Sequence, residues 1–324
     1  MATTQIDGVR RPRQMRRRWW LALVAIALAM VLAFGAVWTN ALGMGERFER
    51  YMARVQAIID PPPDRATLPT VVVTPRPSES PAPAAAEPHT PMDGPEQAAR
   101  PIPVTPTPAP VRAPVDVTIV ADHAAVFNSQ NTSEDCASAG TQMVLAVLGL
   151  ADTSDAFQEE LKSRIGEWES WDDSHDGGWG PAAVSLALAA YGAPGYEIRA
   201  YESHLDAVRG IATAISATGK PVVLFPWWGA HTWVVTGYRA DADPAYFPDA
   251  NVSGLYILDP WYPRVSSIWG PSDPPGNFEE LAEMERNFPY GTNLDGWHRP
   301  EGQYPDRDGK YVMLIPTIPV EGES

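Results

Sequence analysis

The stretch that says most about the fold is "SQNTSEDCASAGTQMVLAVLG", residues 129–149, which holds the only cysteine among 324 residues. Its polar, turn-prone beginning is followed by apolar residues at helical spacing. The pattern predicts a helix over 135–149 with Cys136 in its first turn and Ser133 or Asp135 as its cap. A helix N-terminus favours the reactive thiolate form of a cysteine. Cys136 is therefore a candidate nucleophile, and a small apolar residue at a helix start is the alternative.

The composition narrows the class of protein. One cysteine cannot form a disulfide within the chain, so an exported chain would keep a free thiol or pair it with another chain. The formal net charge is -16, with 40 acidic and 24 basic residues, which argues against a nucleic-acid partner. No pair of histidines has the spacing of a zinc site. We expect no metal, no cofactor and a monomer.

The N-terminal region has the pattern of a membrane anchor. Residues 1–18 carry six Arg, and "WWLALVAIALAMVLAFGAVW", residues 19–38, carries no charge. A helix of this length spans about 30 Å, the thickness of the hydrocarbon core of a bilayer. We predict a single-pass signal-anchor with a cytoplasmic basic head and an extracytoplasmic body. The alternative is a signal peptide cleaved near "ALG", residues 41–43, which would give a secreted protein.

The remainder divides by composition. Residues 39–59 are predicted to form a short helical stalk, and residues 60–114 a Pro-rich disordered linker, because 17 of the 34 prolines lie between 61 and 114. Such a segment cannot bury a core and is typical of an extended tether. A globular domain is predicted over 115–318, followed by a short tail, 319–324.

Within this domain the hydrophobic pattern predicts helices first and antiparallel strands later, which is typical of an α+β fold. The loop "DDSHDGGWG", residues 172–180, is interpreted as a solvated turn, because it lacks the ordered spacing of a calcium loop. The predicted helices are 135–149, 155–165, 181–192 and 203–218, and the predicted strands are 115–120, 221–228, 231–239, 254–259 and 310–316.

An activated thiol needs an imidazole, and that imidazole needs an orienting acid. Of the six histidines, His231 alone opens an apolar strand. Asp259 ends the predicted strand 254–259, which would place an acid at the end of a neighbouring strand. The alternatives are a packed histidine for His231 and an ordinary turn residue for Asp259. Asp241 and Asp243 are rival acids in a predicted turn.

An acyl-transfer site also needs donors for the oxyanion. The backbone N–H of Cys136 is one candidate. Gln130, six residues before Cys136, offers a side-chain amide as a second. The order Gln, Cys, His, Asp completes the set of groups that acyl transfer requires.

Four segments carry a resemblance to a known family: "QNTSEDCASAGTQMVLAVLG", "DGGWGPAAVSLALAAYG", "GKPVVLFPWWGAHTWVVTGY" and "YILDPW". Over about 116–318 the chain resembles the papain-like cysteine peptidases of family 39, the double-glycine-leader, bacteriocin-processing peptidases and their exported relatives. The resemblance implies a papain-like helical lobe packed on an antiparallel sheet. It also implies Cys136 as nucleophile, His231 as general base and then acid, Asp259 as orienting residue and Gln130 as oxyanion donor, acting on a peptide or protein substrate.

This sequence departs from the family pattern in three places. Ala137 follows the cysteine where the family often has glycine, and a Pro- and Asp-rich insertion at 241–253 separates His231 from Asp259. No "GxxxxGKS" segment of an ATP-binding module follows, so a leader-peptide substrate is not implied. The predicted function is a membrane-anchored, extracytoplasmic cysteine peptidase. The alternatives are a catalytically degenerate module that binds peptide or cell-wall polymer, and an amidase or transpeptidase.

Overall fold

A computed structural model describes residues 13–39, 68–74, 110–168, 179–266, 270–287 and 306–320, together with 48, 52, 55, 173, 293–294 and 297–298. The chain divides into two compact units, which are described separately. The first unit contains helix α1 (Arg13–Trp38), and the second contains every other element named below.

Helix α1 covers the whole of the predicted anchor, residues 19–38. Among the residues that the structure describes, however, no helix is both long enough and apolar enough to cross a membrane. The predicted membrane anchor is therefore not supported by the structure and stays a prediction from the sequence. Most of the predicted stalk, 39–59, lies outside the described residues.

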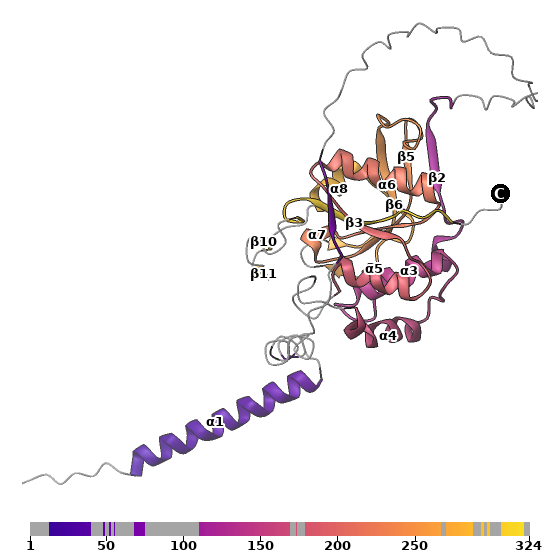
Figure 1. The fold of residues 1–324 in the computed structure, drawn as a ribbon. Helices are drawn as coiled ribbons and strands as arrows, with labels where there is room; N and C mark the ends of the chain where they lie inside the picture. The colour runs from indigo at the N-terminus through magenta and orange to yellow at the C-terminus, as the bar shows by residue number, and fades with distance from the viewer. Residues whose placement is uncertain are drawn as a thin grey trace, which may run out of the picture. The chain divides into compact units, whose positions relative to one another are not determined.

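The second unit is a mixed α+β domain (Figure 1), so the predicted fold class is confirmed at that level. Its helices are α3 (Cys136–Val147), α4 (Asp155–Ser163), α5 (Pro181–Ala190), α6 (His204–Thr218), α7 (Pro226–Gly229) and α8 (Leu281–Asn287), with 3-10 turns η2 (His123–Val126) and η3 (Ile165–Glu167). Its strands are β1 (Thr70–Val73), β2 (Val115–Thr118), β3 (Tyr196–Tyr201), β4 (Val222–Leu224), β5 (Trp233–Ala240), β6 (Val252–Leu258), β7 (Val265–Ser266), β8 (Gly270–Pro271), β9 (Asn277–Glu280), β10 (Asn293–Leu294), β11 (Trp297–His298) and β12 (Tyr311–Pro316).

Among the described residues, one 8-stranded sheet has the order β1-β3-β12-β4-β5-β6-β9, and β2 also pairs with β5. Every pairing is antiparallel except that of β1 with β3. Two short hairpins, β7–β8 and β10–β11, stand apart from this sheet. The register that matters for the site pairs Val234 with Leu258. It brings the beginning of β5 beside the end of β6.

The sheet is covered on both faces (Figure 1). Helix α6 packs on one face, where Ile211 and Ile215 belong to one core cluster. Helices α3 and α5 pack on the other face, where Met143 and Leu188 belong to a second cluster. Double coverage explains why β5, "WVVTGYRA", is buried at seven of its eight positions: a strand buried on both faces reads as a nearly continuous apolar run.

Several sequence predictions need correction. The predicted linker 60–114 contains β1, which pairs with β3 and inserts Val73 against the core. Strand β3, "YEIRAY", was not predicted, although its alternating burial is typical of a strand. The predicted strand 221–228 ends at Leu224, because Pro226 opens the short helix α7. Consequently His231 precedes β5 and does not open it.

The prediction of a solvated turn at 172–180 is wrong for Asp173, which is buried. It is 1% exposed, and its carboxylate accepts hydrogen bonds from the backbone N–H groups of Ala182 and Ala183 in the first turn of α5. The same carboxylate pairs with the buried guanidinium of Arg307 at 2.8 Å. Asp173 therefore caps a helix from a distance in sequence. The other residues of this loop up to 178 lie outside the described part of the chain.

Candidate active site

Cys136 is the first residue of α3 and is partly exposed. Asp135 occupies the cap position, but its side chain makes no capping hydrogen bond. Its carboxylate instead accepts from the Thr132 N–H at 3.1 Å and pairs with Lys162 at 3.1 Å. The prediction that Ser133 or Asp135 caps this helix is therefore wrong for Asp135. The backbone N–H of Cys136 makes no hydrogen bond to another described residue, so a bound substrate can accept one from it.

Helix α3 approaches the start of β5 unusually closely. A Cβ atom added to Gly140 would lie 2.6 Å from Cγ2 of Thr232, which is closer than real side chains approach. Gly140 lies one helical turn after Cys136, and Thr232 follows His231 directly. The missing side chain of Gly140 therefore allows the helix that carries the thiol to pack against the segment that carries the imidazole.

His231 is buried, with 3% of its surface exposed. Its ring stacks on the indole of Trp227, with centroids 4.2 Å apart and planes inclined by 13°. Trp227 has a φ of 54°, which a non-glycine residue adopts only when its surroundings hold it there. The His231 N–H also donates to the Pro226 carbonyl at 3.3 Å. The turn of α7 thus fixes the position and the plane of the imidazole.

Asp259 follows the end of β6 and is 2% exposed. Its Oδ1 lies 2.7 Å from Nε2 of His231. The same oxygen accepts the backbone N–H of Trp261 at 2.9 Å. Because Nε2 is engaged by the carboxylate, the other ring nitrogen of His231 remains for the thiol of Cys136.

The protonation of His231 reflects these neighbours. Burial by itself lowers the pKa of His231, but the charge and hydrogen bond of Asp259 and a side-chain hydrogen bond and charge from Cys136 outweigh it. Together they raise the pKa of His231 to about 9. The neighbours of His231 therefore favour the protonated, imidazolium form of its ring. Cys136, His231 and Asp259 are thus brought together in the structure.

Gln130 is 1% exposed and lies in the loop before α3. Its Nε2 donates one hydrogen bond, to the Thr132 carbonyl at 2.7 Å, and an amide nitrogen carries a second hydrogen. Its Oε1 is buried without a hydrogen-bond partner in the described part of the chain. The backbone of Gln130 is tied to the loop after Asp259, because its N–H donates to the Pro260 carbonyl at 2.9 Å.

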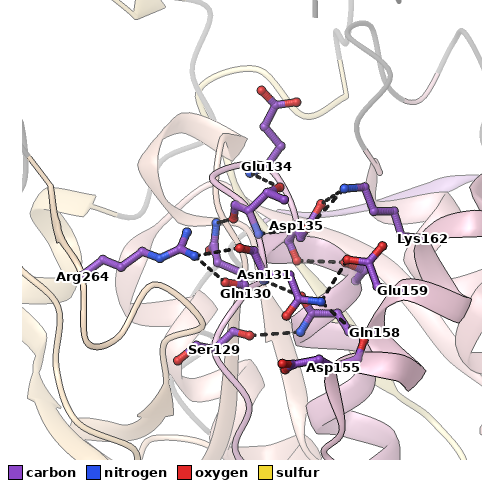
Figure 2. A network of polar contacts seen from close by, with 12 residues as sticks. Ser129, Gln130, Asn131, Glu134, Asp135, Asp155, Gln158, Glu159, Lys162 and Arg264 are labelled. Carbon is purple, nitrogen blue, oxygen red and sulfur yellow. Dashed lines mark hydrogen bonds and ion pairs between the residues drawn. The ribbon is translucent and has the colours of Figure 1, made fainter. Parts of the chain in front are cut away.

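A wider polar network supports the loop before Cys136 (Figure 2). The Asn131 N–H donates to Oε1 of Gln158 at 2.7 Å, and Nε2 of Gln158 donates to the Ser129 carbonyl at 3.1 Å. On the other side, Nη2 of Arg264 donates to the carbonyls of Gln130 and Asn131. This network could not be predicted from the sequence, because a Gln in a helix and an Arg in a loop carry no pattern that pairs them.

A cavity of about 90 Å³ adjoins the His231–Asp259 pair. Trp227, Asp259 and Trp261 form part of its wall, and Glu279 forms another part. Burial raises the pKa of Glu279 to about 7; a hydrogen bond from Asn277 opposes the rise, and Asp273 and Glu283 reinforce it. The cavity wall on this side is therefore aromatic and acidic.

The rival site residues have structural partners elsewhere. Asp241 pairs with Arg112 and accepts from Asn251, and Asp243 accepts from Ser216. The ring of His123 contacts Thr236 at 3.0 Å, and burial lowers its pKa. Burial also lowers the pKa of His204. Among the residues that the structure describes, no three His, Cys, Asp or Glu side chains are grouped so as to hold a metal ion.

Comparison with known proteins adds a structural likeness and no family. No family model matches the chain, and no curated protein matches it. Among solved structures the chain is similar to "Crystal structure of a double glycine motif protease from AMS/PCAT transporter in complex with the leader peptide", with 16% identity and a TM-score of 0.29, over 59% of this chain and 91% of that one. Likeness at this level establishes neither a family nor a function for this chain.

Proposed function

We propose that the domain is a cysteine peptidase that cleaves peptide bonds through a thioester on Cys136. The observation that carries the proposal is the buried His231–Asp259 hydrogen bond beside the thiol, together with a His231 pKa of about 9. An imidazolium next to a cysteine favours the thiolate, which is the nucleophilic form. The aromatic ring of Trp227, stacked on His231, would further stabilise the imidazolium.

The reaction would proceed in two halves. The Cys136 thiolate attacks the carbonyl carbon of the scissile bond, and the His231 imidazolium then gives its proton to the leaving amine as the C–N bond breaks. This leaves an acyl thioester and a neutral imidazole. Water attacks the thioester, His231 accepts the water proton, and release of the acid product restores the thiolate and the imidazolium.

The negative charge on the carbonyl oxygen would be stabilised by two donors. One is the backbone N–H of Cys136, supported by the positive end of α3. The other is the second amide hydrogen of Gln130. Asp259 would hold the imidazole in place and stabilise its charge, without taking the proton itself.

Cleavage of peptides tests the proposal directly. The full chain is incubated with a pool of synthetic peptides in ¹⁸O-labelled water, and fragments are identified by mass spectrometry. We expect fragments with one ¹⁸O at the new carboxyl terminus from the unaltered chain and none from Cys136→Ala. Fragments from both proteins would contradict the proposal. If an amine is included in the incubation, adducts that carry this amine in place of ¹⁸O would identify a transpeptidase.

The second candidate function is a module that binds a ligand without catalysis. Two features would suit binding: Oε1 of Gln130, which has no hydrogen-bond partner in the described part of the chain, and the acidic, aromatic wall of the cavity. It predicts that peptides bind without fragments appearing. It also predicts that Cys136 reacts with iodoacetamide no faster than a cysteine in a short peptide, whereas the peptidase requires faster reaction at neutral pH.

We also propose that residues 19–38 anchor the chain, with the domain outside the cytoplasm. The support is the basic segment 1–18 followed by twenty uncharged residues. A membrane-impermeant maleimide applied to intact cells should label Cys136, and Cys136→Ala should remove the label. Labelling that appears only after the cells are lysed would contradict this location.

A further inference from the structure

Two loops that carry site residues are joined to each other by hydrogen bonds. They are Ser129–Asn131, which precedes Cys136, and Asp259–Arg264, which begins with the orienting acid, and the structure describes both in full. Four hydrogen bonds cross between them. They run from Gln130 N–H to Pro260 O, from Arg264 Nη2 to Gln130 O and to Asn131 O, and from Ser129 Oγ to Tyr262 O.

The bonds fall on both sides of the Gln130 side chain. Its N–H is held at 2.9 Å by Pro260, and its carbonyl is held at 2.8 Å by Arg264. Arg264 also holds the next carbonyl, that of Asn131, at 2.9 Å (Figure 2). Fixing the peptide groups before and after a residue fixes the direction in which its Cα–Cβ bond points. This backbone clamp therefore fixes the base of the Gln130 side chain, and the Thr132 carbonyl, which accepts from Nε2 at 2.7 Å, holds its amide end.

Arg264 is itself held in place. Its N–H donates to the Trp261 carbonyl at 2.8 Å, and its carbonyl accepts from the Ser272 N–H at 3.2 Å. Its guanidinium lies over the ring of Trp261, 5.4 Å from the centroid. A planar guanidinium can donate to two neighbouring carbonyls at once, which an ammonium group on a flexible stem does less well.

We infer that Arg264 is a positioning residue that aims the amide of Gln130 at the oxyanion and ties that aim to the loop of Asp259. The Arg264 side chain donates its hydrogen bonds to backbone carbonyls of the loop before Cys136, and it would act on the reaction through Gln130. The inference rests on the proposed function, because the oxyanion exists only if Cys136 attacks a carbonyl.

Two reactions of the same thiol separate this role from general structural support. Alkylation of Cys136 by iodoacetamide displaces iodide and forms no oxyanion, so it reports on the thiolate and His231 alone. Acylation of Cys136 by p-nitrophenyl acetate passes through an oxyanion, and its leaving group needs no proton. Loss of one oxyanion donor lowers such rates by about 100-fold to 1000-fold in a known hydrolase.

The test compares the two second-order rate constants in the full chain carrying Arg264→Met. We expect acylation to fall by about 10-fold to 100-fold and alkylation to change by less than about twofold. Arg264→Lys should restore part of the lost acylation rate, because one carbonyl can still be held. Arg209→Met is the matched control, since Arg209 also donates to a backbone carbonyl, that of Ala250 at 3.1 Å, outside the site; neither rate should change.

A double-mutant cycle sharpens the assignment. If Arg264 acts through Gln130, adding Arg264→Met to Gln130→Ala should lower acylation by less than about a further twofold. Equal losses of acylation and alkylation, no loss of acylation, or multiplied losses in the double variant would each overturn the inference while leaving the peptidase proposal intact. Acylation of the unaltered chain no faster than that of Cys136→Ala would instead overturn the proposed function and this inference with it.

Discussion

Helices α3 and α5 each begin beside a buried aspartate, yet only one of the two carboxylates caps its helix. Asp173 accepts the N–H groups of Ala182 and Ala183 at 2.9 Å and 3.1 Å. Asp135, directly before Cys136, accepts none from α3. The start of α5 is thereby closed by a side chain, and the start of α3 is left open where the proposed chemistry needs N–H donors.

Backbone conformation explains the difference. Ser154 caps α4 and Ser203 caps α6. Both have extended conformations, with ψ of 149° and 144°, and the side chain of each accepts a backbone N–H from the first turn of its own helix. Asp135 has a ψ of 19°, which turns its carboxylate toward Thr132 and Lys162. Asp173 is not adjacent to α5 and reaches it through space. A Ser or Asp before an apolar run therefore shows where a helix begins, but not whether the N–H groups of its first turn are hydrogen-bonded.

Removing each of the two carboxylates should have very different effects on stability. Asp173→Ala removes two capping hydrogen bonds and leaves the buried guanidinium of Arg307 without this carboxylate, so we expect a loss of about 3–5 kcal/mol in the free energy of unfolding. Asp135→Ala should lose about 1 kcal/mol, because its partner Lys162 is 44% exposed and water replaces the ion pair. Urea unfolding of both variants measures the difference. Equal losses would show that the two helix ends are not distinguished in this way.

His231, beside the start of α3, should also give the domain a distinctive pH dependence. The folded-state pKa of His231, about 9, lies above the ordinary histidine value of 6.5. Its contribution to stability is therefore fully present below about pH 6.5 and is lost as the pH rises through about 9. The loss is on the order of 3 kcal/mol. Urea unfolding at pH 6, 8 and 9.5 should show this decline, and His231→Gln should flatten it; an equal decline in His231→Gln would assign it to other groups.

A smaller effect is expected at Trp227, which stacks on the imidazole. An aromatic face stabilises a neighbouring cation by about 0.5–2 kcal/mol. Trp227→Leu should therefore lower the pKa of His231 and slow alkylation of Cys136 at pH 8 by about 3-fold to 10-fold. Trp227→Phe, which keeps an aromatic face, should retain most of the rate. Equal slowing in both variants would point to lost packing, and no slowing in either would remove Trp227 from the site.

The fold was predictable wherever local pattern decides structure. The apolar spacing after Cys136 predicted its helix, and Pro181 and Gly192 marked the ends of another. The buried side chains of Tyr196, Ile198 and Ala200 alternate with more exposed ones, which is the pattern of a strand and marks β3. Strand β1 could not be predicted, because its place beside β3 depends on a partner more than a hundred residues away.

The candidate site also has a part that local sequence predicts and a part that it does not. Cys136, His231 and Asp259 could be proposed from sequence, because each residue type has a chemical role and each lies at an end of a recognisable element. The stack of Trp227 on His231 and the clamp of Arg264 on Gln130 could not, since both depend on how loops meet in space. The insertion at 241–253 did not disturb the pair, because β5 and β6 remain neighbours in register.

The central claim is that Cys136 and His231 form a thiolate–imidazolium pair, and the pH profile of alkylation tests it most directly. Rates of reaction with iodoacetamide are measured from pH 4 to pH 10 in the full chain and in His231→Ala, with Cys136→Ala as the background. We expect fast alkylation of the unaltered chain at pH 6–7, and a fall of at least about tenfold in His231→Ala at the same pH. Superimposable profiles for the unaltered chain and His231→Ala would contradict it.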